Sequence, residues 1–265
     1  MKLLITGARG TVGQAFVAEA ATAGIKPIAW DRASAPPDQP EAGRALIDHH
    51  QPDALVCLAV PSTSTGRPDE GRLINVEWPA FLASESRKRS IPMIYTSTVM
   101  VFSDHARGPF RPETPPDATT GYGGEKRRGE EAVLQAYPGA IIARLGWQIG
   151  ETFTGNTMTA HLAGQMARDG VISASRRWLP ATSMLTDTAR ALLSLTRGAE
   201  SGIYHLSAND RWNFFEIAVA LNRRHGDRWN VTPNDDFIYD QRMLDEKIAL
   251  PPLAKHLPEL IADNA

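Results

Sequence analysis

The chain has 265 residues, enough for one large domain or two small ones, and its 42% hydrophobic and 22% charged residues are ordinary for a globular protein. Its 28 Lys and Arg residues nearly balance 30 Asp and Glu residues, so bulk charge predicts neither a nucleic-acid nor a membrane-surface partner. The single cysteine, Cys57, excludes an internal disulfide, and no run approaches 18 apolar residues. We therefore expect a cytoplasmic protein.

The first 21 residues predict a strand, a glycine-rich turn and a helix. Leu3–Ile5 is a short apolar run, and residues 14–21 are rich in helix formers. The glycines between them allow a tight turn that brings the backbone close to a pyrophosphate at the helix N-terminus. The turn is therefore expected to bind a dinucleotide, with contacts from Gly7, Arg9, Gly10, Thr11, Val12 and Gly13.

A second strand is predicted over residues 25–30, and it ends at Asp31. An acidic side chain about 20 residues beyond the glycines can accept the hydroxyls of the adenine ribose, which favours NAD. Arg32 and Arg9 could instead meet the 2′-phosphate of NADP. We expect both cofactors to be accepted, with Asp31 and Arg32 as contacts.

Residues 41–50 are expected to form a helix, and the apolar run 53–60 a buried strand. This strand leads into the loop 61–66, where ligands bind in open α/β sheets, and a helix is expected over 72–87. His49 and His50 are adjacent and cannot share a helix face as metal ligands do, so we expect no metal site.

A further strand, 91–95, runs into the hydroxyl cluster Thr96-Ser97-Thr98. The long, proline-rich loop 103–120 then leads to a helix that carries Tyr122 and Lys126. Residues i and i+4 share a helix face. A lysine charge about 4 Å from a phenol, at an effective dielectric of about 20, favours the phenolate by roughly 4 kcal/mol, or about 3 pKa units, before any offset from desolvation. Taken alone, this spacing fits a surface i,i+4 pair; together with the rest of the chain it predicts an acid–base pair in which the pKa of Tyr122 is lowered.

The remaining chain is expected to hold a strand at 140–144, helices at 186–195 and 214–222, and a short strand at 202–206. Asn213 and Glu216 form a capping-box pattern. We expect an α/β fold: a Rossmann-type doubly wound parallel sheet over residues 1–146, to which 183–206 return, and a smaller substrate-binding part over 147–265.

Several motifs together resemble the extended short-chain dehydrogenase/reductase superfamily, and within it the dTDP-4-dehydrorhamnose reductase family. The resemblance covers most of the chain. It is carried by Thr6-Gly7-x-x-Gly10-x-x-Gly13, Asn75, Ser97-Thr98-x-x-Val101-Phe102, Tyr122-Gly-x-x-Lys126-x-x-Gly129-Glu130, Arg144-x-x-Trp147, Gly155-Asn156, Asp187-x-Ala189 and Gly202-Ile-Tyr-His205.

The resemblance implies a role for each matching residue. Tyr122 would give a proton to the substrate carbonyl oxygen, Lys126 would lower its pKa and bind the nicotinamide ribose, and Thr98 would hydrogen-bond the same oxygen. NAD(H) or NADP(H) would be held by the glycine turn and by Leu58, Ala59 and Val60. Trp147 and Asn156 would contact the substrate. Val99 and Met100 replace the family's usual Asp-Tyr pair, which implies the loss of a polar contact to the sugar.

The function expected from these features is an NAD(P)H-dependent reductase of a keto group on a nucleotide-activated deoxysugar. Two alternatives stay open: a nucleotide-sugar epimerase or dehydratase of the same superfamily, and a non-catalytic dinucleotide-binding regulatory subunit. The expected partner is a small-molecule substrate, with a homodimer as a possible assembly.

Overall fold

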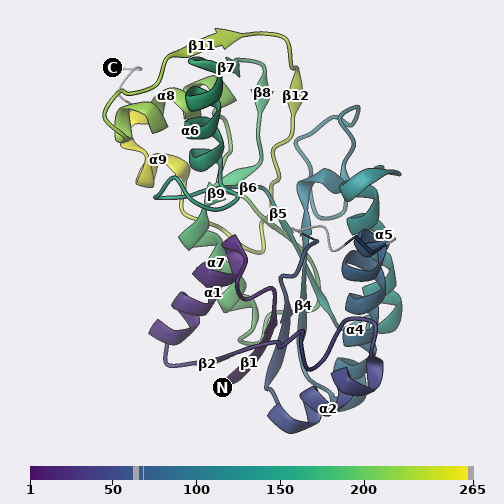
Figure 1. Ribbon diagram of the computed structural model, residues 1–265. Coiled ribbons are helices and arrows are strands. Elements are labelled where there is room, and N and C mark those ends of the chain that lie inside the picture. Colours follow the sequence, from purple (N-terminus) through teal and green to yellow (C-terminus); the bar gives the residue numbers. More distant parts are fainter. Residues whose placement is uncertain (62–65, 68, 262–265) are drawn as a thin grey trace. The chain divides into compact units, whose positions relative to one another are not determined.

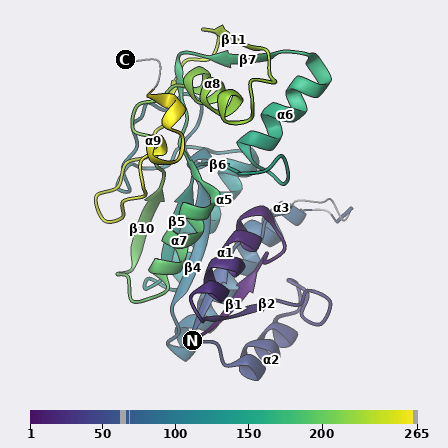
Figure 2. The same cartoon turned by 90° about the vertical axis from the view of Figure 1, so that its left-hand side faces the viewer.

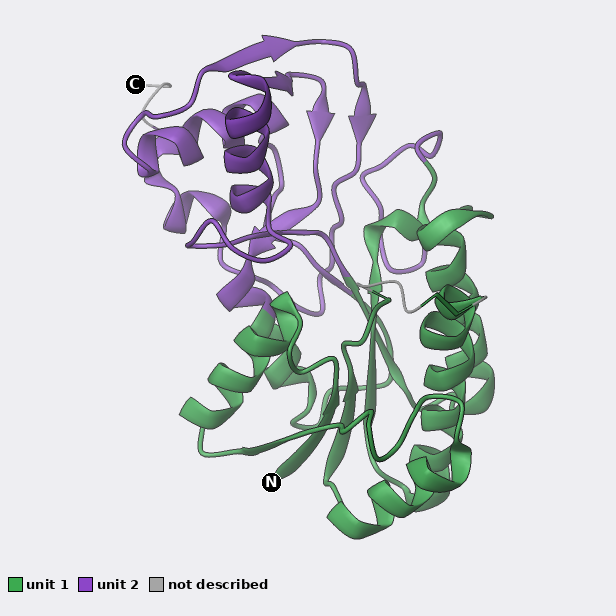
Figure 3. Cartoon of the chain, viewed as in Figure 1, with its two compact units in different colours: residues 1–103, 115–144, 189–204 green, residues 104–114, 145–188, 205–265 purple. Residues whose placement is uncertain are grey.

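A computed structural model describes residues 1–61, 66–67 and 69–261, so the ligand-binding loop expected at 61–66 lies largely outside the described residues. The chain divides into two compact units (Figure 3). Unit 1 comprises residues 1–103, 115–144 and 189–204, and unit 2 comprises 104–114, 145–188 and 205–265. Among the described residues, no helix is both long and apolar enough to cross a membrane.

Unit 1 is built on a six-stranded parallel sheet in the order β10-β5-β4-β3-β1-β2. The expected Rossmann-type sheet is thereby confirmed. Its strands are β1 (Lys2–Thr6), β2 (Lys26–Ala29), β3 (Ala54–Cys57), β4 (Met93–Thr98), β5 (Ile141–Leu145) and β10 (Gly202–Leu206).

Helices cover both faces of this sheet (Figure 1 and Figure 2). One face carries α1 (Thr11–Thr22) and α7 (Leu185–Leu195), which are linked by the ion pair of Arg190 with Glu19 at 3.2 Å. The other face carries α4 (Trp78–Arg89) and α5 (Gly121–Ala136). The layered arrangement follows from the continuous apolar strands, which must be buried on both sides.

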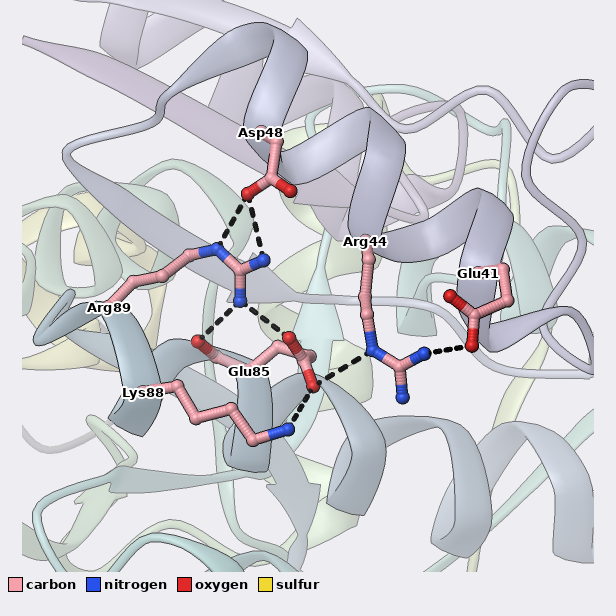
Figure 4. A network of polar contacts seen from close by, with 6 residues as sticks. All are labelled: Glu41, Arg44, Asp48, Glu85, Lys88 and Arg89. Atoms are coloured by element: carbon pink, nitrogen blue, oxygen red, sulfur yellow. Dashed lines mark hydrogen bonds and ion pairs between the residues drawn. The ribbon is translucent and has the colours of Figure 1, made fainter.

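A buried carboxylate holds α2 (Pro40–His50) to α4 (Figure 4). Glu85 is only 2% exposed, and its oxygens accept hydrogen bonds from Arg44, Lys88 and Arg89. Burial alone would raise the pKa of Glu85, but the bonds from these three cations outweigh it and lower the pKa to about 2. The carboxylate is therefore ionised at any physiological pH.

The segment expected to be one helix over 72–87 is divided into three parts: α3 (Glu70–Arg72), the π-helical segment η1 (Leu73–Glu77) and α4. Asn75 lies in the π-helical segment, and its carbonyl oxygen accepts a hydrogen bond of 2.7 Å from the hydroxyl of Tyr95 on β4. A Cβ atom at Gly129 on α5 would lie 2.1 Å from the same oxygen. The π turn therefore marks a place where helix and sheet approach closely.

Unit 2 contains three two-stranded parallel pairs and its own apolar core. Its elements are β6 (Trp147–Ile149), α6 (Met158–Asp169), β7 (Ile172–Ser175), β8 (Trp178–Leu179), β9 (Thr182–Met184), α8 (Phe214–Arg224), β11 (Val231–Asn234), β12 (Tyr239–Asp240), α9 (Leu253–His256) and the 3₁₀ turn η3 (Pro258–Leu260). The capping box at the start of α8 is present as predicted, because Asn213 and Glu216 each accept the other's backbone N–H.

Candidate active site

The glycine turn lies at the carboxyl end of β1, where the strand order reverses between β1 and β3. Gly7 has a φ of 71°, and a Cβ atom there would lie 2.6 Å from the backbone nitrogen of Ala59. The turn therefore packs directly on the residues that follow β3, and only glycine fits. Leu58 and Ala59 thus lie beside the turn, and the half-exposed Val60 follows them, at the edge of the sheet where ligands of open α/β sheets bind.

The other two glycines of the turn have different neighbours. A Cβ atom at Gly13 would lie 2.1 Å from the carbonyl oxygen of Gly7, so this glycine is required by packing. A Cβ atom at Gly10 would meet only that oxygen, at 3.3 Å, and Gly10 itself is exposed. The fold therefore needs Gly7 and Gly13 far more than it needs Gly10.

The N-terminus of α1 is suited to an anion. No side chain caps the helix, and its first turn carries no acidic residue. Arg9 and Gly10 are exposed beside it, and Thr11 and Val12 are partly exposed in its first turn. The positive end of a helix dipole without a competing carboxylate favours phosphate, so the residues present fit the pyrophosphate of a dinucleotide.

Asp31 and Arg32 follow β2 and are both exposed. Hydrogen bonds from the backbone N–H of Ala33 and from Ser34, together with the charge of Arg9, lower the pKa of Asp31. Arg32 lies over the ring of Trp78, 5.8 Å from its centroid. An ionised carboxylate and two guanidinium groups therefore follow β1 and β2, where they could meet either form of adenine ribose.

Thr98 ends β4 and caps the 3₁₀ turn η2 (Val99–Val101). Its Oγ1 accepts a hydrogen bond of 3.2 Å from the backbone N–H of Met100, which leaves the hydroxyl proton available to donate. Ser97 Oγ beside it is 3% exposed and has no hydrogen-bond partner in the described part of the chain. Thr98 can thus donate a hydrogen bond at the carboxyl edge of the sheet.

The first turn of α5 packs on that 3₁₀ turn. A Cβ atom at Gly123 would lie 1.9 Å from the carbonyl oxygen of Met100, and one at Gly124 would lie 2.6 Å from the carbonyl carbon of Thr119. The glycines after Tyr122 therefore let the helix begin directly against the residues that follow Thr98. Tyr122 remains 37% exposed there, as a group that acts on a substrate must be.

Lys126 is buried one helical turn beyond Tyr122 and is 1% exposed. Its Nζ donates a hydrogen bond of 2.8 Å to the carbonyl oxygen of Thr96 and lies 4.4 Å from the centroid of the Tyr95 ring. Burial lowers the pKa of Lys126 to about 8, although nearby acidic groups oppose the shift. Part of the Lys126 population is therefore neutral at mildly alkaline pH.

The effect of Lys126 expected from the spacing does not decide the pKa of Tyr122, because desolvation has the larger effect. Burial, followed by the charge of Glu125, raises the pKa of Tyr122 to about 12. The Nζ of Lys126 lies 6.0 Å from the centroid of the Tyr122 ring and donates its hydrogen bond to the carbonyl oxygen of Thr96. Tyr122 is thus protonated at neutral pH, as a proton donor needs to be.

Glu125 is a part of this site that the sequence pattern missed. Its carboxylate accepts a hydrogen bond of 2.8 Å from Asn75 Nδ2 and packs against Gly71. Asn75 is fully buried, and its Oδ1 has no partner within the described residues. An acid beside a Tyr-x-x-x-Lys pair was visible in the sequence, but its partner lies 50 residues away and no local signal identifies it.

A buried ion pair anchors α5 to β5. Arg144 Nε and Nη2 donate hydrogen bonds of 2.9 and 2.7 Å to the two carboxylate oxygens of Glu130, and both residues are almost fully buried. The guanidinium also lies 5.2 Å from the centroid of the Phe102 ring. The pair thus joins three sequence motifs that were noted separately: the Tyr122 helix, the Arg144 strand and Phe102.

The two expected substrate contacts belong to unit 2. Trp147 begins β6 and packs with Trp178 and Phe214, whose ring centroids lie 6.1 and 6.0 Å from its own. The exposed ring of His161 lies edge-on to Trp147 at 5.2 Å. Asn156 lies in the loop before α6 and is exposed. No group of three or more metal-ligating side chains occurs among the residues that the structure describes.

Comparison with known proteins identifies the family. The model of the RmlD substrate binding domain matches residues 1–238, most of the chain. The chain belongs to the RmlD substrate binding domain family. The family membership expected from the motifs is thereby confirmed.

Relatives of this RmlD-family chain include a probable dTDP-4,6-dihydroxy-2-methyloxan-3-one 4-ketoreductase of Streptomyces antibioticus. It is 31% identical over 230 residues, which cover 84% of this chain and 77% of the relative. The dTDP-4-keto-6-deoxy-D-glucose reductase of Streptomyces niveus is 27% identical, with 84% and 78% coverage. The crystal structure of dTDP-4-dehydrorhamnose reductase from Bacillus anthracis in complex with NADP shares the fold: its TM-score is 0.82 at 18% identity, covering 100% of this chain and 99% of that one.

Proposed function

We propose that this chain is an NAD(P)H-dependent reductase of a keto group on a nucleotide-activated deoxysugar. The main supporting observation is a set of three residues in a chain of this family: Thr98 ends β4, and Tyr122 and Lys126 lie in the first two turns of α5. The named ketoreductase and reductase relatives support the substrate class. Nucleotide-linked substrates and reduced dinucleotides support a cytoplasmic reaction.

We assign cofactor binding to unit 1. The glycine turn and the uncapped α1 N-terminus would hold the pyrophosphate, with Leu58, Ala59 and Val60 beside it. Asp31, Arg32 and Arg9 would meet the adenine ribose of NAD or NADP. When bound, the cofactor supplies a hydride to the carbonyl carbon.

Side chains of the protein would bind and protonate the oxygen of that carbonyl. Thr98 Oγ1, fixed by the N–H of Met100, would donate a hydrogen bond to it. Tyr122, whose pKa is raised to about 12, would carry the proton that the oxygen receives. The ammonium of Lys126 would stabilise the phenolate that is left behind, since a nearby positive charge favours the ionised form. Trp147 and Asn156 are the proposed substrate contacts of unit 2.

The test combines two measurements on the purified full chain. The first is mass analysis of any dinucleotide that copurifies, and the second is oxidation of NADPH or NADH in the presence of nucleotide-linked 4-keto-6-deoxyglucose. Stoichiometric cofactor oxidation supports the reductase. Sugar isomerisation with a retained dinucleotide and no net oxidation would instead indicate an epimerase. Dinucleotide binding without turnover on any keto sugar would indicate a regulatory subunit. Light scattering tests the homodimer, which stays a prediction.

A further inference from the structure

The carboxylate of Glu125, which precedes Lys126 on α5, is held by two contacts from outside its own helix. Its Oε2 accepts a hydrogen bond of 2.8 Å from Nδ2 of Asn75, a fully buried residue of the π-helical segment. At Gly71 on α3, a Cβ atom would lie 2.3 and 2.5 Å from the two carboxylate oxygens. The carboxylate is therefore wedged against the start of the neighbouring helix instead of turning freely in solvent.

Asn75 also connects this carboxylate to the surroundings of Lys126. The backbone carbonyl oxygen of Asn75 accepts a hydrogen bond of 2.7 Å from the hydroxyl of Tyr95. The ring of Tyr95 lies 4.4 Å from Nζ of Lys126. Asn75, Tyr95 and Lys126 are all buried, so an electrostatic effect of Glu125 on the ammonium is screened less than it would be at a water-exposed surface.

The charges around Lys126 leave Glu125 without a cation of its own. Burial lowers the pKa of Lys126 to about 8, and three acidic groups oppose this effect: Cys57, then Glu130, then Glu125. Burial raises the pKa of Cys57 to about 12, so it is a neutral thiol. Glu130 is neutralised by its two hydrogen bonds with Arg144. Glu125 forms no ion pair within the part of the chain that the structure describes, so its charge is available to balance the ammonium.

The other titratable groups that face Lys126 are phenols, and both are neutral. Burial raises the pKa of Tyr95 well above 10. Burial, followed by the charge of Glu125, raises the pKa of Tyr122 to about 12. Of the two proposed catalytic groups, Lys126 therefore loses its proton first as the pH rises.

On the basis of the proposed function, we propose that Glu125 is a positioning residue: its fixed carboxylate keeps the ammonium of Lys126 charged and thereby sets the upper pH limit of catalysis. The reaction needs this ammonium, because it stabilises the phenolate that Tyr122 becomes after giving its proton to the ketone. Without the carboxylate, the buried ammonium has less to offset its desolvation, and it releases its proton at a lower pH.

The test compares Glu125→Gln with Glu131→Gln. Glutamine has the shape of glutamate and can still accept the hydrogen bond of Asn75, so the first substitution removes the charge alone. Glu131 lies on the same helix, is 61% exposed and pairs with Arg127, which makes its substitution a matched control.

Two measurements are made on the parent chain and on both variants between about pH 6 and pH 10. The first is urea unfolding of each protein with Lys126 and with Lys126→Met. The stability difference within such a pair begins to rise at the pKa of Lys126, and its measurement needs no turnover. The second is the pH profile of single-turnover oxidation of NADPH by nucleotide-linked 4-keto-6-deoxyglucose.

In Glu125→Gln, we expect the rise in the stability difference and the alkaline loss of activity both to move to lower pH, by about 0.5 to 1 unit. In Glu131→Gln, neither should move. A Glu125→Gln protein that is slower at every pH, with both transitions where the parent has them, would overturn the proposal and leave Glu125 a packing role. A shifted stability transition in a chain that reduces no keto sugar would support the effect of Glu125 on Lys126 but overturn the reductase assignment.

Discussion

The ammonium of Lys126 is bonded to the carbonyl oxygen of Thr96, two residues before the threonine that is proposed to bind the substrate. The lysine is thus fixed to β4 by a main-chain acceptor, while the helix that carries it also carries Tyr122. A single hydrogen bond of 2.8 Å therefore sets the position of the charge relative to both proposed catalytic hydroxyls.

Tyr122→Phe should lower the rate of single-turnover hydride transfer by about 10²–10⁴ while leaving NADPH affinity nearly unchanged, because it removes the proton donor but keeps the ring. Tyr137→Phe, at the end of the same helix, is the matched control and should react like the parent chain. Rapid-mixing measurements at saturating cofactor provide the comparison. Full activity in Tyr122→Phe would remove Tyr122 from the mechanism.

Lys126→Met should abolish most turnover without destabilising the chain at pH 7. Burial lowers the pKa of this lysine from 10.5 to about 8, so below pH 8 the folded chain bears the whole cost of a buried charge. Above pH 8 the folded chain releases the proton before the unfolded chain does, and the parent gains stability relative to the variant. The full gain by pH 10.5 is about 3 kcal/mol.

Urea unfolding of the parent and of Lys126→Met at pH 7, 8, 9 and 10 measures this difference, because the other titrating groups are common to both proteins. A stability difference that stays constant across this range would contradict the lowered pKa.

Gly10→Val should abolish dinucleotide binding but leave the fold intact, since a side chain there meets little protein and would fill the space of the pyrophosphate. Gly13→Val should unfold or severely destabilise the chain, because its Cβ atom would collide with the carbonyl oxygen of Gly7. Circular dichroism and calorimetric titration with NADH and NADPH separate the two effects. Unchanged affinity of Gly10→Val for both cofactors would remove the turn from the binding site.

Asp31→Ala should shift cofactor preference toward NADPH, because it removes an exposed carboxylate that repels a 2′-phosphate. Arg32→Ala should shift preference toward NADH by removing a cation that could meet the 2′-phosphate. The ratio of the two dissociation constants is the quantity to compare among the three proteins. If neither substitution moves that ratio, the adenine ribose is recognised elsewhere.

Glu85→Gln should lower the free energy of unfolding by about 2 kcal/mol at pH 7, since it leaves three cations without their shared carboxylate; the value is reduced because Lys88 and Arg44 are partly in water. The folded pKa of Glu85 is depressed to about 2, so this stabilisation is complete above pH 4.5 and is lost as pH falls toward 2.

The control for this variant is Glu41→Gln, which removes another partner of Arg44. Glu41 is 88% exposed, so its substitution should change stability little. Equal losses in the two variants would mean that the burial of Glu85 has no energetic role.

Features that depend on neighbours in sequence were predictable. The glycine turn between β1 and α1, the Asn213 capping box and the one-turn spacing of Tyr122 and Lys126 all follow from local chain geometry. Gly129 of the same motif packs closely in the structure, with the carbonyl oxygen of Asn75 beside it.

Features that depend on distant partners were not predictable. The pKa of Tyr122 is set by burial and by Glu125, and Glu125 in turn is held by Asn75. Likewise, Lys88 and Arg89, three and four residues after Glu85, could be paired with it from the sequence, but the bond from Arg44, 41 residues earlier on α2, could not. Neither of these two long-range contacts can be predicted from a short window of sequence.

The π-helical segment at Leu73–Glu77 fixes the rotational phase of α4. Successive residues of an α-helix are rotated by about 100° about the helix axis. A π turn, closed by an i→i+5 hydrogen bond, holds one residue more than an α-helical turn. Deleting one residue from this segment would let the hydrogen-bond ladder run on unbroken, but it would rotate Trp78, Leu82 and Glu85 away from the positions they now occupy. The surplus residue thus keeps the buried side of α4 in phase with the sheet, and length variation here should be tolerated far less well than substitution.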